Sequence, residues 1–412
     1  MKAEAATNLE DPIALEERYQ LATYKKMPII AERGQGVWIY TSDGEKYLDL
    51  YGGHAVAGTG HSHPQVVAAI QAQAEKLLFY SNLVYSEARG RAAEKLVSVA
   101  PAELTKAFFC NSGTEANENA MRMARMATGR ENIITFSGGF HGRTADSISA
   151  TFLGKYREIG KPNVPGHLEA EFGNIESVRE LANEKIAAIM LEPIQSMAGV
   201  RMANPNFYQA LRELCDQRAI VLIYDEVQTG VGRTGDWFFA GSEAGAKVVP
   251  DIVTLAKALG SGIPVGACLV TDKISASIRE NDLGTTFGGG MIAMAAVTAT
   301  LEAIANDGML ANVKTTEAYL RRRLAKVPQV AAVRGRGFLL GIEFRAPAAA
   351  IHKALLELAR IVEQELLPRV NAECAAAMND FDLYRILSKP GDEATRFFVG
   401  PRGRPPRLID PE

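Results

Sequence analysis

The sequence predicts an α/β fold whose mostly parallel sheet is covered by helices on both faces. From Pro64 to about Leu259, apolar runs of strand length alternate with helical patterns. The 412 residues are 47% hydrophobic and 23% charged, which provides enough apolar material for a large core. The 45 Lys and Arg nearly balance the 48 Asp and Glu, for a formal charge of −3, so we expect neither nucleic acid nor a membrane as a partner.

The predicted elements follow in chain order. Residues 36–51 predict two short strands around the turn Ser42-Asp43-Gly44. The middle of the chain predicts a strand ending in AFFCN, a helix from Gly113 to Met126, and strands at NIITF, AAIMLEPI and AIVLIYDEV. Helices at 291–306, 308–325 and 349–367, a strand pair in VAAVRGRGFLLGIEF and an irregular tail from about 388 complete the chain. We expect an N-terminal segment over 1–60, a large domain over 61–309 and a smaller C-terminal domain over 310–412, which the N-terminal segment joins.

The N-terminal residues and the cysteines indicate the compartment. The stretch MKAEAATNLEDPIALEERYQ contains no apolar segment of the kind found in secretion signals, and no run approaches the ~20 apolar residues of a membrane helix. The four cysteines show neither a CxxC pair nor metal-ligand spacing: Cys110, Cys215, Cys268 and Cys374. We therefore expect a cytoplasmic protein with reduced core cysteines and no metal site.

Two segments that follow predicted strands suit a phosphate and a planar ring. Ligands of α/β sheets gather beyond the carboxyl ends of the strands. In CNSGTEANENAMRMAR, the hydroxyls of Ser112 and Thr114 and the N–H groups of Gly113 and Thr114 suit a phosphate at a helix N-terminus, although a plain serine cap explains the same residues. In FSGGFHGRTADSISATF, Phe140 stands beside glycines, where an aromatic ring can stack on a ligand.

Two charged residues follow the next predicted strands. Asp225 ends IVLIYD, where a carboxylate can hold a positive charge of a ligand or only form a turn. Lys257 follows DIVTL and precedes GSGIP, which suits a nucleophile toward a carbonyl, although a surface lysine is the plainer interpretation. The order of phosphate cradle, aromatic residue, Asp and Lys fits pyridoxal phosphate, which needs a Schiff-base lysine and an acid beside the ring nitrogen.

From about Thr23 to Phe344 the sequence resembles the class III (subgroup II) aminotransferases, and in particular the acetylornithine and ornithine aminotransferase group. The matching motifs stand in chain order: YKKMPIIAERGQGVWIYTSDGEKYLDL, GHSHP, YSNLVYSE, CNSGTEANENAMRMAR, GGFHGRT, LEPIQ, DEVQTGVGRTG, AKALGSGIPVGA and TTFGG. The resemblance implies a fold type I, pyridoxal-phosphate-dependent enzyme. Such an enzyme moves an amino group from an amino acid, which in this family includes ω-amino acids of the ornithine and acetylornithine type, to a 2-oxo acid by a ping-pong mechanism.

The resemblance also implies roles for single residues. Lys257 acts as nucleophile and general acid/base, and Asp225 pairs with the ring nitrogen. The remaining cofactor residues are Phe140 and Val227 on the two ring faces, Gln228 on the ring's 3′ oxygen, Ser112, Gly113 and Thr114 on the phosphate, and Thr286 on the phosphate of the neighbouring subunit. The role of Thr286 implies a homodimer with shared active sites. For the substrate, Arg143 binds a carboxylate and Tyr24 contacts the α-carboxylate of the amino donor.

The chain departs from the family pattern where substrates are distinguished. Relatives that act on ω-amino groups continue LEPIQ with Gly-Glu, and that Glu pairs with an arginine near the C-terminus. Here Met197 stands in place of the Glu, and only Arg385 and Arg396 partly match the arginine segment. Either arginine in the pocket favours a substrate with a distal carboxylate, whereas a pocket without them favours pyruvate as acceptor. A decarboxylase, racemase or aminomutase with the same cofactor, or a non-catalytic protein of this fold, is the alternative.

Overall fold

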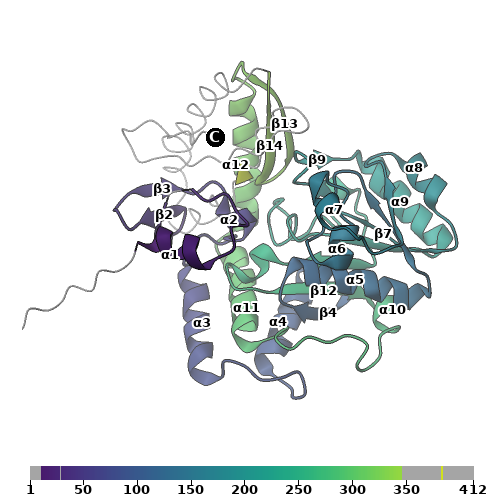
Figure 1. The fold of residues 1–412 in the computed structure, drawn as a ribbon, viewed down its shortest axis with the longest axis horizontal. Helices are drawn as coiled ribbons and strands as arrows, with labels where there is room; N and C mark the ends of the chain where they lie inside the picture. The colour runs from purple at the N-terminus through teal and green to yellow at the C-terminus, as the bar shows by residue number, and fades with distance from the viewer. Residues whose placement is uncertain (1–10, 28, 346–381, 384–412) are drawn as a thin grey trace, which may run out of the picture.

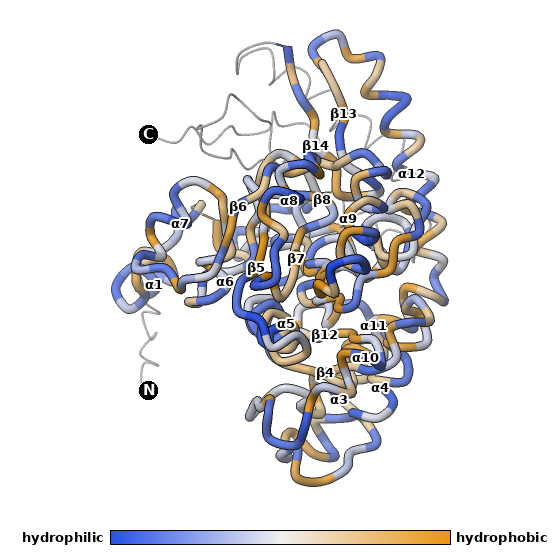
Figure 2. The backbone as a smooth tube through the Cα atoms, turned by 90° about the vertical axis from the view of Figure 1, so that its right-hand side faces the viewer, coloured by the Kyte–Doolittle hydropathy of each residue, from blue (hydrophilic) through white to orange (hydrophobic). Residues whose placement is uncertain are grey.

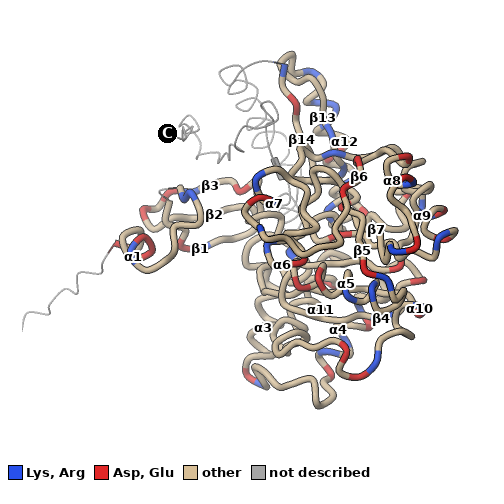
Figure 3. Tube along the Cα trace, turned by 45° about the vertical axis from the view of Figure 1, so that its right-hand side comes forward, with Lys and Arg blue, Asp and Glu red and all other residues tan. Residues whose placement is uncertain are grey.

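The computed structural model describes residues 11–27, 29–345 and 382–383. The helix expected at 349–367, the tail from about 388, Cys374, Arg385 and Arg396 lie outside the described residues. Within the described part, Lys and Arg are mixed with Asp and Glu along surface elements such as α8 and α9, as the near-zero net charge predicts (Figure 3).

A seven-stranded sheet forms the centre of the molecule, in the order β4-β12-β11-β10-β7-β5-β6 (Figure 1). Only β12 runs against its neighbours, so the prediction of a mostly parallel sheet is confirmed. The strands are β4 (Leu104–Cys110), β5 (Asn132–Phe136), β6 (His167–Ala170), β7 (Ile186–Leu191), β10 (Val221–Asp225), β11 (Ile252–Leu255) and β12 (Gly266–Thr271).

Helices cover both faces of this sheet. On one face α5 (Gly113–Thr128) contacts β12, β11 and β7, and on the other α4 (Glu87–Ser98) and α9 (Pro205–Arg218) contact β4 and β10. Side chains of β10 alternate between the two layers: Ile223 packs in the cluster with α5, and Leu222 in the cluster with α9. Figure 2 shows hydrophobic residues along these strands. Burial on both faces explains why the strands are apolar throughout.

The remaining helices flank this core or connect its strands. α3 (Pro64–Lys76) packs along α11 (Met291–Asn306), and α12 (Met309–Leu324) follows in chain order (Figure 1). The shorter helices are α1 (Pro12–Tyr19), α6 (Ala145–Ser149), α7 (Lys155–Ile159), α8 (Ile175–Leu181) and α10 (Asp272–Ser275), with 3-10 turns η1 (Glu243–Gly245) and η2 (Lys257–Gly260). None of the helices in the described ranges is long and apolar enough to cross a membrane.

Three smaller sheets complete the described structure. They are β1 (Ala31–Gln35) with β2 (Trp38–Thr41) and β3 (Lys46–Leu48), β13 (Val330–Arg336) with β14 (Leu339–Phe344) and β15 (Asp382–Leu383), and β8 (Ile194–Gln195) with β9 (Arg201–Met202). The predicted strand pairs at 36–51 and in VAAVRGRGFLLGIEF are confirmed as β2–β3 and β13–β14. Strand β1 was not predicted.

Local chemistry explains where the elements end. α5 continues two residues beyond the predicted end at Met126 and stops at Gly129, whose φ of 68° closes the helix. The run AAIMLEPI is divided into β7 and β8 because Pro193 has no N–H for a sheet ladder. Cys110, Cys215 and Cys268 are free and buried.

Candidate active site

Strand parity places Asp225 on the α5 side of the sheet. Val221 and Ile223 face α5, so Asp225, two residues further, faces it as well. Asn117 of α5 donates from Nδ2 to Oδ2 of Asp225 at 2.8 Å. The Oδ1 of Asn117 accepts the hydroxyl of Thr254, the corresponding residue of the neighbouring strand β11, at 2.6 Å. The helix that begins at Gly113 therefore also holds the carboxylate.

A histidine completes the surroundings of this carboxylate. His141 Nδ1 lies 2.8 Å from Oδ2 of Asp225, and the N–H of Val227 donates to Oδ1 at 3.1 Å. Asp225 is 4% exposed and the side chain of His141 is fully buried. Nε2 of His141 has no hydrogen-bond partner among the described residues. The carboxylate is thus fixed by three protein groups.

A second buried carboxyl, Glu192 of the LEPIQ motif, lies in the same neighbourhood. Burial, with a smaller contribution from the charge of Asp225, raises its pKa to about 7 against the opposing charges of His141 and Lys257. Oε1 of Glu192 accepts the backbone N–H of Phe140 at 2.8 Å. Sequence reasoning did not single out Glu192, although its place just beyond the apolar strand β7 is a usable signal.

Lys257 stands at the end of β11, beside β10, in a strained backbone conformation. Its φ is 46°, in the left-handed region, where a non-glycine residue costs of order 1–3 kcal/mol and often marks a functional site. The side chain is half-buried, and its Nζ donates to Oε1 of Gln228 at 3.2 Å. Two of the predicted site residues are thereby in direct contact.

The predicted phosphate cradle forms the first turn of α5. Ser112 caps this helix, because its Oγ accepts the N–H of Glu115 at 3.2 Å, as the plainer interpretation expects. The N–H groups of Gly113 and Thr114 bond to no other residue in the described ranges. A Cβ on Gly113 would lie 2.8 Å from Cγ1 of Val227, so only glycine allows this close approach. Two free N–H groups at the positive end of a 16-residue helix suit an anion.

Phe140 and Arg143 lie on the segment between β5 and α6. The Phe140 ring meets the Tyr156 ring edge-on, with centroids 5.5 Å apart and planes at 73°. The guanidinium carbon of Arg143 lies 4.9 Å from the centroid of the same Tyr156 ring. Arg143 is otherwise exposed to solvent. Tyr156 therefore links two predicted site residues, although nothing in the sequence singled it out.

Other predicted residues lie apart from the cluster formed by Asp225, Lys257, Gln228 and Phe140, or near it. Tyr24 is 64% exposed in the segment between α1 and β1, and Thr286 is exposed in the loop before α11. No hydrogen bond in the described ranges joins either residue to the cluster. Met197 follows β8 by two residues. The neighbouring Ala198 approaches the Phe140 segment so closely that a Cβ on Gly138 would lie 2.9 Å from the Ala198 Cβ.

The residues present fit pyridoxal phosphate. The cradle supplies two unpaired N–H groups for a phosphate, Lys257 supplies a primary amine, and Asp225 supplies a buried carboxylate for a protonated ring nitrogen. No group of three or more His, Cys, Asp and Glu side chains suited to a metal ion occurs in the described ranges. The donor set therefore suits an organic anion that carries an aldehyde and a basic ring.

Comparison with known proteins agrees with this chemistry. The sequence model of the class-III aminotransferase family matches residues 19–364. The chain is 40% identical over 334 residues to an acetylornithine aminotransferase of Methanopyrus kandleri, covering 81% of this chain and 85% of that one. It is 41% identical over 358 residues to an acetylornithine aminotransferase of Methanocaldococcus jannaschii, covering 84% and 89%. The ornithine aminotransferase of Toxoplasma gondii shares the fold, with a TM-score of 0.77, 24% identity, and coverage of 90% and 94%.

The family match and the relatives at about 40% identity show a transferase of the pyridoxal-phosphate type, and helices on both faces of a mostly parallel sheet agree with it. The chain belongs to the class-III aminotransferase family. Its reaction is the pyridoxal-phosphate-dependent transfer of an amino group, as the sequence predicted.

Proposed function

We propose that Lys257, Asp225 and Gln228 are the centre of the active site, with Ser112, Gly113 and Thr114 as the phosphate cradle. The main support for this proposal is the 3.2 Å hydrogen bond from Lys257 Nζ to Gln228 Oε1. Lys257 follows β11, which is paired with β10, the strand that ends in the buried Asp225. When bound, pyridoxal phosphate supplies an aldehyde that reacts with amines and a ring that withdraws electrons.

Each residue of the proposed site has a separate role in the reaction. Nζ of Lys257 would hold the cofactor between turnovers and would carry the proton that leaves the substrate carbon. Asp225 holds a proton on the ring nitrogen, and Asn117 and His141 keep its carboxylate in place. Phe140 and Val227 would hold the ring, in the roles that the family resemblance implies for them.

Lys257→Ala tests the assignment most directly. The variant loses the amine that bonds to the cofactor and moves the proton, so we expect turnover to fall by at least a thousandfold while the protein stays folded. Steady-state rates and a thermal melt, with Lys247→Ala as a matched control on a surface lysine, check this. Residual transamination above the rate of free cofactor would contradict the assignment.

We propose an amino donor of the acetylornithine type and a 2-oxo acid as the second substrate. The relatives at about 40% identity that carry the name acetylornithine aminotransferase support the donor. Arg143 and Tyr24 are the carboxylate-binding residues in this proposal, because Arg143 presents an exposed guanidinium beside the Phe140 segment. We also propose a cytoplasmic location, where the buried thiols of the described residues remain reduced.

We further propose a homodimer formed through an exposed apolar surface beside Thr286. The uncharged segment LLFYSNLVY (77–85) includes Leu83 at 93% and Tyr85 at 106% exposure, and its Phe79 ring packs 5.2 Å from the ring of Phe287. A groove of about 370 Å³ beside these rings is lined mainly by apolar residues. So much exposed apolar surface is typical of an interface.

The homodimer proposal has a simple test in solution. A charge at the centre of the apolar surface should separate the subunits, so we expect Leu83→Glu to sediment as a monomer and to bind the cofactor less tightly. Ile159→Glu, at a position 70% exposed on α7, is the matched control and should leave the assembly unchanged. A wild-type monomer, or a dimer that survives Leu83→Glu with Tyr85→Glu, contradicts the proposed interface.

A further inference from the structure

The segment that carries Arg143 is held by the helix that begins at the cradle. Side chains at successive turns of α5 reach this segment: Thr114 Oγ1 lies 2.6 Å from Thr144 Oγ1, and Asn117 Nδ2 donates to the carbonyl of His141 at 2.7 Å. Arg143 itself makes no hydrogen bond to any residue in the described ranges. Its position therefore depends on how its neighbours are fixed.

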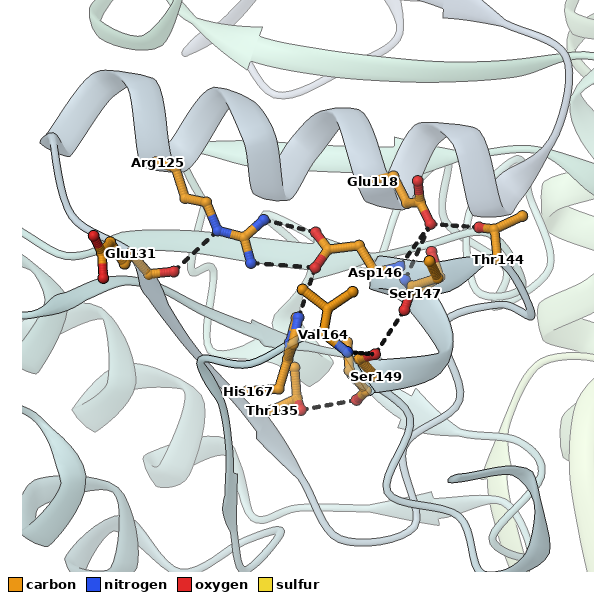
Figure 4. Close-up of polar contacts among 12 residues, drawn as sticks. Glu118, Arg125, Glu131, Thr135, Thr144, Asp146, Ser147, Ser149, Val164 and His167 are labelled. Carbon is orange, nitrogen blue, oxygen red and sulfur yellow. Dashed lines mark hydrogen bonds and ion pairs between the residues drawn. The ribbon is translucent and has the colours of Figure 1, made fainter. Parts of the chain in front are cut away.

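Glu118 of α5 makes the most extensive of these contacts (Figure 4). Its Oε1 accepts three hydrogen bonds, from Thr144 Oγ1 at 2.5 Å, from the N–H of Asp146 at 3.0 Å and from the N–H of Ser147 at 3.2 Å. Thr144 precedes α6 but its side chain makes no capping bond to that helix. Glu118 thus caps α6 from a neighbouring helix and fixes the backbone directly after Arg143.

Asp146, whose N–H donates to Glu118, is itself held in place by its side chain. Asp146 accepts from Arg125 of α5 at 2.6 Å, and its other oxygen lies 2.7 Å from Nε2 of His167 on β6 (Figure 4). Hydrogen bonds from His167 and Arg125 outweigh burial and lower the pKa of Asp146 to about 2, so this carboxylate is charged at neutral pH. The first turn of α6 is therefore a rigid base for the residue that precedes it.

Tyr156 fixes the guanidinium from the other side. The cation lies 4.9 Å from the ring centroid, and the same ring supports Phe140 at 5.5 Å. A guanidinium that rests with its carbon over an aromatic ring keeps N–H groups available for a planar carboxylate. The ring thus orients the cation without occupying its hydrogen-bond donors.

We propose that Glu118 and Tyr156 are positioning residues for Arg143: Glu118 fixes the backbone on its C-terminal side, and Tyr156 fixes the guanidinium. This inference rests on the proposed function, in which Arg143 binds a substrate carboxylate. An arginine ordered before the substrate arrives loses less side-chain entropy on binding, so the two residues raise affinity for carboxylates without touching the reacting atoms.

The experiment compares Glu118→Ala and Tyr156→Leu with the conservative variants Glu118→Gln and Tyr156→Phe, which keep an acceptor oxygen and an aromatic face. Binding of glutarate, an unreactive dicarboxylate, is measured by calorimetry on the holoenzyme, together with KM and kcat for amino donor and 2-oxo acid. We expect about threefold to tenfold weaker glutarate binding and higher KM for Ala and Leu, with kcat of Glu118→Ala within about twofold of the wild type. Gln and Phe should restore most of the affinity.

The same substitutions in an Arg143→Gln background separate positioning from a general structural effect. If the two residues act through Arg143, Glu118→Ala and Tyr156→Leu weaken glutarate binding no further in that background. Equal losses in both backgrounds, or unchanged Kd and KM in the single variants, overturn the inference while the proposed function stands. If Arg143→Gln alone leaves carboxylate affinity unchanged, the proposed role of Arg143 fails and the inference fails with it.

Discussion

Gly266, the first residue of β12, lies where a single methyl group would press on the backbone that leads into α5. A Cβ at this position would lie 2.3 Å from the carbonyl oxygen of Ser112 and 2.8 Å from Sγ of Cys110, its partner across the strand pair. Ordinary contact begins at 3.4 Å, so Gly266→Ala requires the Ser112 backbone to move by roughly 1 Å. Ser112 caps α5, so the shift reaches the cradle.

The expected size of the effect follows from two sources. Overpacking of a rigid sheet costs about 1–3 kcal/mol of folding free energy. A shift of this size also spoils hydrogen bonds of 2.7–3.2 Å to a phosphate, and losing one charge-assisted bond costs about 1.5–3 kcal/mol. Gly266→Ala should therefore bind pyridoxal phosphate roughly tenfold to a hundredfold more weakly and melt at a lower temperature.

A matched glycine provides the control. Gly90 lies inside α4, and a Cβ there would meet nothing within 4 Å. Gly90→Ala should leave the cofactor affinity unchanged and stabilise the helix by about 0.5–1 kcal/mol. The cofactor affinity of both variants is measured by titrating the cofactor-free proteins and following the absorbance. Their stability is measured by thermal melts. Wild-type cofactor affinity in Gly266→Ala would refute the packing argument.

Three further predictions concern the site and its support. Asp225→Ala should slow single-turnover proton removal at least a hundredfold and weaken cofactor binding far less, because the ring nitrogen loses its partner but the phosphate does not; unchanged single-turnover rates would exclude this role. The pKa of Asp146 is about 2, below its usual 3.8, so its ion pair stabilises the fold above pH 3.8, and this contribution is lost as the pH falls toward 2. Asp146→Asn should cost roughly 1–2 kcal/mol in urea unfolding at pH 7 and flatten the loss of stability in acid; a variant that retains the wild-type slope contradicts the assignment. In acceptor assays, pyruvate should rival or exceed 2-oxoglutarate in kcat/KM if neither Arg385 nor Arg396 enters the pocket, because the acceptor site near Met197 is then apolar. Met197→Glu should lower kcat/KM for 2-oxoglutarate by repelling its distal carboxylate. A strong 2-oxoglutarate preference that survives both Arg385→Ala and Arg396→Ala contradicts this expectation.

Much of the fold and the family could be predicted from the sequence because the signals are local. Strand and helix lengths come from apolar runs such as IVLIY and from the cap Ser112, and each depends on residues a few positions apart. The placement of Asp225 and Lys257 at strand ends follows from the same reasoning, since both directly follow an apolar run. The family motifs are contiguous, so they too can be recognised without knowledge of the folded chain.

Contacts between distant segments were decided only by the tertiary structure. Asn117 and His141 lie 108 and 84 positions from the Asp225 that they hold, and no spacing rule relates them. The same is true of the antiparallel direction of β12, and of α2 (Gly52–Ala55), where His54 adopts a φ of 65°, which is uncommon for a residue other than glycine. Glu118 reads in the sequence as one more polar residue of a surface helix. It becomes a cap for α6 because folding places the N-terminal end of α6 beside α5. Contacts of this kind depend on which residues are close in space, and the local sequence around Glu118 does not reveal this.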